Sequence, residues 1–211
     1  MLEEKMKTVR NLLGLAIAAS FLLAGCGGQP AAPAAKIVSI SGQVEARAMA
    51  DQSFSTASAD QQLMAGGAVR TGKDSVASLL TVADSAKVDV AADSYFEVRA
   101  GDDKIGFQGD GKAVFDVNKQ QKSIVVETQH GNTAVLGTRF GQLVSSGSFE
   151  LYVAEGKVEF TSKTGEKRQV GAGQQLVWNT AEALPAVAET NVVESEAFFG
   201  SGDKGFEFNR R

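Results

Sequence analysis

The chain has 211 residues, of which 43% are hydrophobic and 22% are charged, and its formal net charge is −4 at pH 7. This composition is typical of a globular chain with one core, and 23 glycines against 3 prolines favour strands joined by tight turns. A nucleic-acid partner is excluded, because it requires clustered Lys and Arg and no basic stripe follows Arg10.

Residues 1–25 are predicted to be a lipoprotein signal peptide. Lys5, Lys7 and Arg10 precede an apolar run at 12–24, which is the layout of a secretory signal. As a helix this run would be about 20 Å long, whereas a bilayer core is about 30 Å thick. The run is therefore interpreted as a cleaved signal helix rather than a membrane span.

Cys26 is the only cysteine in the chain. The preceding Leu23-Ala24-Gly25 resembles the bacterial lipobox, after which the chain is cleaved and the cysteine is acylated. Acyl chains such as palmitate on Cys26 would attach the protein to a membrane, and residues 26–36 would form a flexible linker. Gly27 at the next position resembles an outer-membrane address, so we expect the periplasmic face of a Gram-negative outer membrane.

Residues 37–180 are predicted to form one all-β domain of short strands. Apolar and polar residues alternate there, and Gly, Asp, Asn and Ser interrupt them, which is typical of strands and turns. Further on, Phe149, Leu151 and Val153 fall on one face, and a turn at Glu155-Gly156 follows. Strands are expected at 37–40, 69–71, 76–82, 87–90, 95–98, 105–107 and 124–127.

A turn glycine followed by an alternating strand occurs three times, in SGQVEARA from Ser41, DGKAVFDV from Asp110 and EGKVEFTS from Glu155. The unequal spacing excludes a strict repeat protein. The recurrence predicts strands laid successively side by side, as a twisted β-solenoid-like or β-roll domain. A β-sandwich is the alternative.

Residues 181–211 are predicted to be a C-terminal tail. Asn191 and Glu194 have the spacing of a capping box, apolar residues follow at 197–199, and Gly200 is a suitable end, so a short helix is expected. The last residues, from 201 onward, are interpreted either as a frayed end or as a final strand.

Residues 124–178 carry a series of short motifs. IVVETQHGNTAVLGTRFGQLV is followed by ELYVAEGKVEF and VGAGQQLVW. This order resembles the signature of the FecR-like domain family, with its T-x-x-G, VLGT-x-F, EGKV and closing GQ-x-L elements. The similarity extends over residues 37–179, and its most specific part is the run 135–140.

The resemblance implies an all-β periplasmic domain that contacts other proteins and has no catalytic role. The best-known members pass a signal from outer-membrane iron-siderophore receptors to a cytoplasmic sigma factor. A cytoplasmic helical domain before the apolar run and a receptor-contacting module after Trp178 have no counterpart in this sequence. We therefore expect a partner among the envelope proteins and no direct contact with a sigma factor.

The matched positions are candidate structural or docking residues. Gly137 would permit a bend, Thr138 would cap a turn through its hydroxyl, and Phe140 would return to the core. Arg139 would either pair with a carboxylate inside the fold or face a partner. The complete set is Gly131, Leu136, Gly137, Thr138, Arg139, Phe140, Gly156 and Gly173.

No catalytic site, metal site or cofactor is predicted. His130 is the only histidine, no nucleophile elbow accompanies it, and it is interpreted as a solvated turn residue. Asp102, Asp103 and Asp110 lack the spacing of a calcium loop and are interpreted as parts of two hairpin turns.

Three functional hypotheses follow. The leading one is a non-catalytic, lipid-anchored periplasmic protein that docks an envelope protein or takes part in envelope signalling. The second is a glycan- or peptidoglycan-binding lipoprotein, with Trp178, Tyr95 and Tyr152 as a stacking platform. The third is a hydrolase that uses His130 with an acidic residue.

Overall fold

The computed structural model describes residues 32–81, 86–99, 101 and 103–190. The chain divides into residues 1–31 and residues 32–211, and only the second part is described below. The predicted signal peptide, Cys26 and the helix expected after Asn191 lie outside the described residues. No helix in the described ranges is long and apolar enough to cross a membrane.

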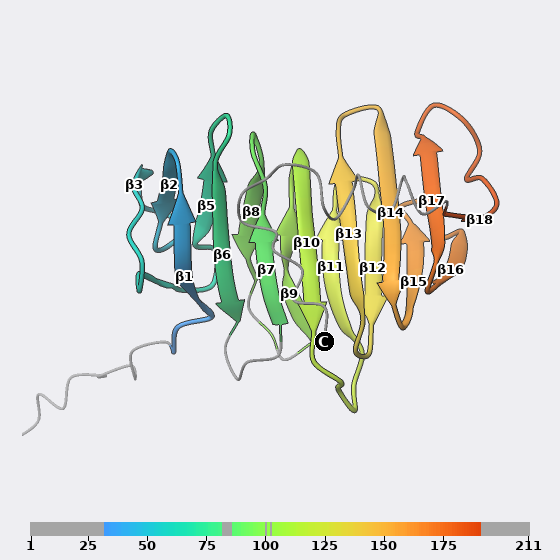
Figure 1. Ribbon diagram of the computed structural model, residues 1–211, viewed down its shortest axis with the longest axis horizontal. Coiled ribbons are helices and arrows are strands. Elements are labelled where there is room, and N and C mark those ends of the chain that lie inside the picture. The colour runs from blue at the N-terminus through green and yellow to red at the C-terminus, as the bar shows by residue number, and fades with distance from the viewer. Residues whose placement is uncertain (1–31, 82–85, 100, 102, 191–211) are drawn as a thin grey trace, which may run out of the picture. The chain divides into compact units, whose positions relative to one another are not determined.

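The described residues form two open sheets of nine strands each (Figure 1). Sheet A has the order β18 (Ala188–Glu189), β17 (Gln174–Asn179), β14 (Ser148–Glu155), β13 (Arg139–Val144), β10 (Gly111–Val117), β7 (Ala86–Val90), β6 (Val76–Thr81), β1 (Ala35–Ser41) and β4 (Gln62–Leu63). Sheet B has the order β16 (Lys167–Gly171), β15 (Lys157–Ser162), β12 (Gly131–Val135), β11 (Ile124–Thr128), β9 (Lys104–Gln108), β8 (Tyr95–Val98), β5 (Ala68–Thr71), β2 (Val44–Arg47) and β3 (Ser55–Thr56).

The chain passes back and forth between the two sheets, so the strand order within each sheet largely follows the chain order. Figure 1 shows this progression from β1 to β3 at one end to β17 and β18 at the other. All described strand pairs are antiparallel except β9 with β11. The predicted all-β fold of short, successively stacked strands is confirmed, as a solenoid-like winding of two layers.

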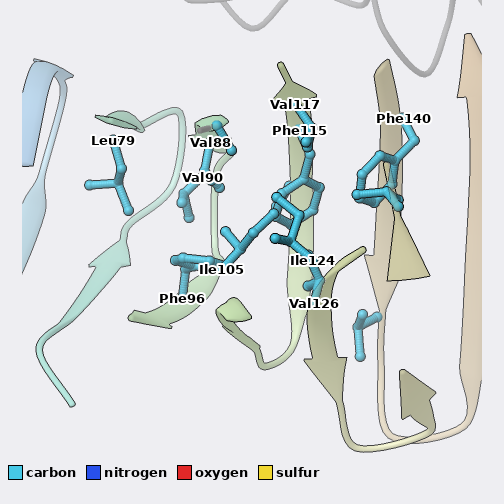
Figure 2. Close-up of a cluster of buried hydrophobic side chains, with 14 of the residues drawn as sticks. Leu79, Val88, Val90, Phe96, Ile105, Phe115, Val117, Ile124, Val126 and Phe140 are labelled. Carbon is cyan, nitrogen blue, oxygen red and sulfur yellow. The ribbon is translucent and has the colours of Figure 1, made fainter. Parts of the chain in front are cut away.

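The core lies between the sheets and consists of large apolar side chains from both (Figure 2). The ring of Phe115 stacks on that of Phe140 with centroids 4.8 Å apart. The predicted inward face of β14 is confirmed, since Phe149 and Leu151 are 0% exposed and Val153 is 3% exposed. Burial of each such side chain stabilises the fold by about 1.5 to 3 kcal/mol, which fixes the strand register.

The three recurring glycine turns all connect one sheet with the other. Gly42 lies between β1 and β2, Gly111 at the start of β10, and Gly156 between β14 and β15. Their φ angles are +81°, +105° and +83°, a region that favours glycine. The turn containing Asp110 is therefore a crossover between sheets, and the prediction that it closes a hairpin was wrong.

A hydroxyl group from a second crossover contacts each of these glycine turns. The amide of Gln43, after Gly42, donates to Ser75 Oγ at 2.8 Å, and Ser75 in turn donates to the Lys73 carbonyl at 2.9 Å. In the third copy, Thr138 Oγ1 donates to the carbonyl of Lys157, which follows Gly156, at 3.1 Å. We call these contacts crossover latches.

The second latch repeats the geometry of the first. The amide of Lys112, after Gly111, donates to Ser94 Oγ at 2.8 Å, and Ser94 donates to the Ala92 carbonyl at 2.8 Å. The residue before each latch hydroxyl has a positive φ: Asp74 at 54°, Asp93 at 50° and Gly137 at 144°. The crossovers therefore share a positive φ at one position and a hydroxyl-mediated contact, although their sequences differ.

Replacement of Ser94 by alanine should lower the free energy of unfolding by about 1 to 3 kcal/mol, because the Lys112 amide loses its acceptor in a poorly hydrated corner. Urea unfolding would measure this loss. Ser146→Ala is the matched control, since Ser146 is exposed, and it should change little. Equal stability of the two variants would show that the latch contributes nothing.

Candidate interaction surface

The signature run 135–140 forms the crossover from β12 in sheet B to β13 in sheet A. A Cβ on Gly137 would lie 2.6 Å from Lys119 Cα, and one on Gly156 would lie 2.8 Å from the Gly137 carbonyl oxygen. Both positions also have positive φ angles. The crossover at 137 therefore packs closely against the connection that contains Lys119 and against the crossover at 156, and these two close approaches require glycine at 137 and 156.

Two further signature residues are tightly packed, Phe140 at this corner and Gly131 at the other end of β12. Phe140 is 0% exposed and stacks on Phe115. Gly131, the first residue of β12, leaves no room for a side chain, because a Cβ there would meet the Thr161 carbonyl and, at 2.8 Å, the Phe160 ring. Gly173 has φ +77° in the turn between β16 and β17, and nothing lies within 4 Å of the position that a Cβ would take.

Leu136 is the signature residue that faces solvent. It is 52% exposed, the largest value among the exposed large hydrophobic residues of the described chain. Arg139 is half-buried, and its ladder partners are Asp116 of β10 and Glu155 of β14. Asp116 and Glu155 are both exposed, so the ladder partners supply no buried carboxylate, and the two roles considered for Arg139 stay predictions.

A shallow groove of about 360 Å³ lies beside Leu136. Its lining combines an apolar side, formed by Ala134 and Leu136, with the charged Lys157 and Glu159. Ser123 and Gln169 add polar groups. A mixed apolar and charged surface next to a rigid corner fits a peptide segment of another protein better than a buried small molecule.

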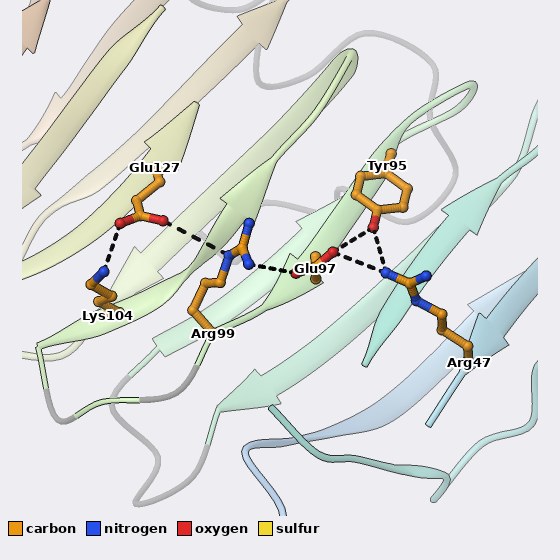
Figure 3. Close-up of polar contacts among 6 residues, drawn as sticks. All are labelled: Arg47, Tyr95, Glu97, Arg99, Lys104 and Glu127. Atoms are coloured by element: carbon orange, nitrogen blue, oxygen red, sulfur yellow. Dashed lines mark hydrogen bonds and ion pairs between the residues drawn. The ribbon is translucent and has the colours of Figure 1, made fainter. Parts of the chain in front are cut away.

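The outward face of sheet B carries a network of charges that the sequence did not predict (Figure 3). Glu97 accepts from Arg47 at 3.0 Å, from Tyr95 at 2.8 Å and pairs with Arg99 at 2.8 Å. Along a single strand the members of the network occupy alternate positions, but their contacts join β2 with β8. Arg47 and Glu97, for example, are 50 positions apart in the sequence. Only the sheet order could reveal them.

The network continues to a second carboxylate, Glu127 of β11. Glu127 pairs with Lys104 at 2.8 Å and lies 3.8 Å from the Arg99 guanidinium. The Arg99 guanidinium also lies 5.4 Å from the centre of the Phe107 ring. Each charge thus has an opposite neighbour, although the three cations outnumber the two carboxylates by one. The network links side chains across the face of sheet B.

Tyr95 is the group in this network whose ionisation is most strongly affected. Burial, followed by the hydrogen bond to Glu97, raises the pKa of Tyr95 to about 12 from its ordinary value of 10.0. The neutral phenol can donate to the carboxylate, whereas a phenolate would repel it.

The residues considered for catalysis and metal binding are not brought together. His130 lies in the predicted turn, but it is half-buried rather than solvated: its Nε2 is 2.5 Å from the Ser145 carbonyl and its ring packs edge-on against Trp178. Asp110 accepts from the Gln129 amide at 2.9 Å. No cluster of metal-ligating side chains occurs in the described part of the chain, which omits Asp102.

The three aromatic residues considered for glycan stacking also lie apart. Tyr95 is on the outward face of sheet B, and Tyr152 is 8% exposed on sheet A. Trp178 packs against Phe160 and donates its indole N–H to the Glu182 carbonyl at 3.0 Å. They do not form a common platform.

Residues 67–159 match the model of the family described as FecR protein. This part of the chain is similar to the FecR domain. The match includes the second and third latches and the run 135–140, so the predicted resemblance is confirmed there. Gly173 lies beyond it. No protein of curated function matches the chain.

A similar fold occurs in solved structures. Two crystal structures of a candidate anti-sigma factor from Parabacteroides distasonis are each 16% identical to this chain, with TM-scores of 0.55 and 0.54. The aligned parts cover 64% and 63% of this chain, and 65% and 64% of the other. At this identity the likeness shows a shared fold.

Gly156→Ala should destabilise the FecR-like domain more than Gly165→Ala does. Their φ angles are similar, +83° and +88°, but nothing lies within 4 Å of a Cβ at 165, whereas at 156 it would contact the Gly137 carbonyl. The difference isolates the steric cost, and we expect it to be about 1 to 3 kcal/mol. Chemical unfolding of both variants would measure it; equal losses would contradict the close packing of the two crossovers.

Ionisation of Tyr95 should weaken the fold at high pH. Because the folded pKa is raised, its stabilising effect is complete below pH 10 and is lost as the pH rises toward 12. The stability difference between the natural protein and Tyr95→Phe should therefore shrink over this range. Urea unfolding at several pH values would test this, and a difference that stays constant would count against the coupling.

Proposed function

We propose that this protein is a non-catalytic envelope protein whose FecR-like domain binds another protein and takes part in envelope signalling. The observation that supports this most directly is the exposure of Leu136, at 52%, within the most specific run of the family signature. Its neighbours Gly137 and Thr138 are held by backbone packing and a hydrogen bond. A large apolar side chain presented by a rigid corner is typical of a contact residue.

The groove beside Leu136 defines the kind of partner. Lys157 and Glu159 on one side can pair with charges of either sign, while Ala134 and Leu136 offer apolar contact. Such a site binds a short segment of a folded protein with a central apolar residue. The family match supports this proposal, because FecR-type regulators are envelope proteins that transmit signals.

Attachment to a membrane forms the second part of the proposal. We propose that Cys26 is acylated and that residues 26–36 tether the domain to the outer membrane on its periplasmic side. The lipobox-like Leu23-Ala24-Gly25 and the Gly27 that follows support this assignment. Direct contact with a sigma factor is not part of the proposal, although the similar fold from Parabacteroides distasonis belongs to a candidate anti-sigma factor.

Site-specific photo-crosslinking in cells would test the proposed surface. A photoreactive residue at position 136 should capture a defined envelope protein, and the same group at position 49 should not, because Met49 is 42% exposed in the loop between β2 and β3. Leu136→Asp should abolish co-purification of that partner while leaving the melting temperature unchanged, since the side chain is exposed. Met49→Asp is the control.

Partner binding that survives Leu136→Asp would contradict the proposal, because it would show that the signature corner is not the contact surface. Sedimentation with peptidoglycan in place of a protein partner would favour the glycan-binding alternative.

The anchor has a separate test. Cys26→Ser should release the protein from the membrane fraction and abolish labelling by radioactive palmitate, because the thiol that carries the acyl chains is gone. Retention of this variant in the membrane fraction would contradict the proposed attachment.

A further inference from the structure

The four strands at the sheet edges differ in length. The described sheets end at β18 and β4 in sheet A and at β16 and β3 in sheet B. The strands β3, β4 and β18 have two residues each, whereas β16 has five. Very short edge strands protect a sheet against pairing with other chains. Among the described strands, β16 is therefore the edge to which another strand can be added, and Figure 1 shows it next to β15 at the C-terminal end of its sheet.

The hydrogen bonds around β15 show in which direction its backbone groups point. The amide of Lys163, just after β15, donates to the His130 carbonyl at 3.0 Å, on the side of β12. The amide of Ser162 donates to the Glu166 carbonyl at 2.9 Å, on the side of β16. Because the backbone groups of successive residues in an antiparallel strand point in opposite directions, the even-numbered residues of β15 bond β16 and the odd-numbered residues bond β12.

The same alternation leaves Gln169 with its backbone N–H and C=O unpaired. Register places Arg168 and Val170 opposite even-numbered residues of β15, so the backbone of these two residues bonds β15. The backbone of Gln169, between them, points away from the sheet, and it has no hydrogen-bond partner among the described residues. The Gly171 amide points in the same direction, since it donates to Gln174 Oε1 at 2.9 Å. Gln169 is also exposed, so its free backbone groups are accessible.

Contacts on the inward side hold β16 in an extended conformation. Val170 points into the core and is 0% exposed. Arg168 lies on the same side of the strand and donates to the carbonyls of Leu184 and Pro185 at 2.6 Å and 2.7 Å. An edge that is already extended and fixed needs little further ordering when a second strand binds, and this lowers the entropic cost of binding.

The hairpin of β15 and β16 is basic, although the whole chain is acidic. Residues 157–171 contain four cations and two carboxylates, a net charge of +2, against −4 for the whole chain. Lys167 is paired with Glu159 at 2.8 Å. Lys157 and Lys163 are exposed and make no ion pair with another described residue. The edge therefore attracts an acidic segment, and it disfavours pairing with the same basic hairpin of a second copy.

The free edge is continuous with the groove beside Leu136. Gln169 and Lys157 both line that groove. Register places Ala134, Glu159 and Gln169 in one row across β12, β15 and β16. A strand added beside β16 would extend this row, so that its alternate side chains would border the groove.

We propose that an acidic, extended segment of the envelope partner adds to sheet B as a strand beside β16. Its backbone bonds the N–H and C=O of Gln169, its alternate side chains border the groove, and a carboxylate among them pairs with Lys157. The inference rests on the proposed function, because it assigns a binding mode to the partner of that same groove.

Gln169→Pro would test the strand addition. Proline removes the outward N–H and leaves the bonds of the two neighbouring residues to β15, and an edge strand tolerates it at such a position. With a photoreactive residue at position 136, capture of the envelope partner in cells should fall about tenfold in this variant. Gln169→Ala is the matched control, and it should capture normally because it keeps the N–H. Melting temperatures of both variants would show that the fold is retained.

Hydrogen exchange would report on the same contact in the natural protein, independently of any destabilisation by proline. The partner captured through position 136 would be purified and added to the full-length protein. Exchange of the Gln169 amide should then slow by about tenfold or more, because the amide gains an acceptor. The amide of Ser146, in the loop between β13 and β14, is the control and should exchange at an unchanged rate.

The outcomes separate this inference from the proposed function. Capture at position 136 that survives Gln169→Pro, with unchanged exchange at Gln169, would overturn the strand addition and leave the Leu136 surface in place. A photoreactive residue at position 167 tests the edge alone. Capture of an envelope protein there that is lost in Gln169→Pro and weakened in Lys157→Glu would support the edge even if position 136 captured nothing. Capture of nothing at position 167, or only of further copies of this chain, would overturn the proposed acidic partner.

Discussion

The crossover latch is the interaction on which the rest of the structure depends. Two layers of short strands stay aligned only if each passage between them has a fixed length and direction. A buried hydroxyl fixes both by hydrogen bonding to a neighbouring glycine crossover. The latch residues Ser75, Ser94 and Thr138 are 0% to 4% exposed, so each unmade bond would leave a poorly hydrated polar group. The core rings then pack at fixed heights between the sheets.

The corner at Leu136 and the outward faces of the two sheets differ in exposure and polarity. At the corner, Gly137 and Gly156 allow close backbone contact, and the adjacent Leu136 side chain is exposed to solvent. On sheet B, charges of opposite sign pair with one another and make a polar face. On sheet A, Val114 and Tyr152 form a small buried apolar cluster, with Leu143 and Ala154 packed against it. An exposed apolar corner and a concealed apolar surface thus occur on one small domain.

Short-range patterns were enough to predict most of the strands. The alternation in 149–153 specifies which side of β14 is buried because a shift of one residue would expose three large apolar groups. Glycine turns were predicted as turns for the same local reason, the need for a positive φ. Their role as crossovers was not predictable, since a turn of identical sequence can close a hairpin or change sheets. Asp110 was misassigned on this account.

The sequence by itself determined the all-β class, the inward faces of the strands, the glycine turns and the family signature, because each depends on residues within a few positions of one another. Tertiary structure decided which contacts join distant segments. Gln43 bonds Ser75, 32 positions away, Arg47 pairs with Glu97, 50 positions away, and one row of outward residues crosses five strands of sheet A. Those contacts arise only when sheet order and register place separate strands side by side. Local periodicity carries no information about that order.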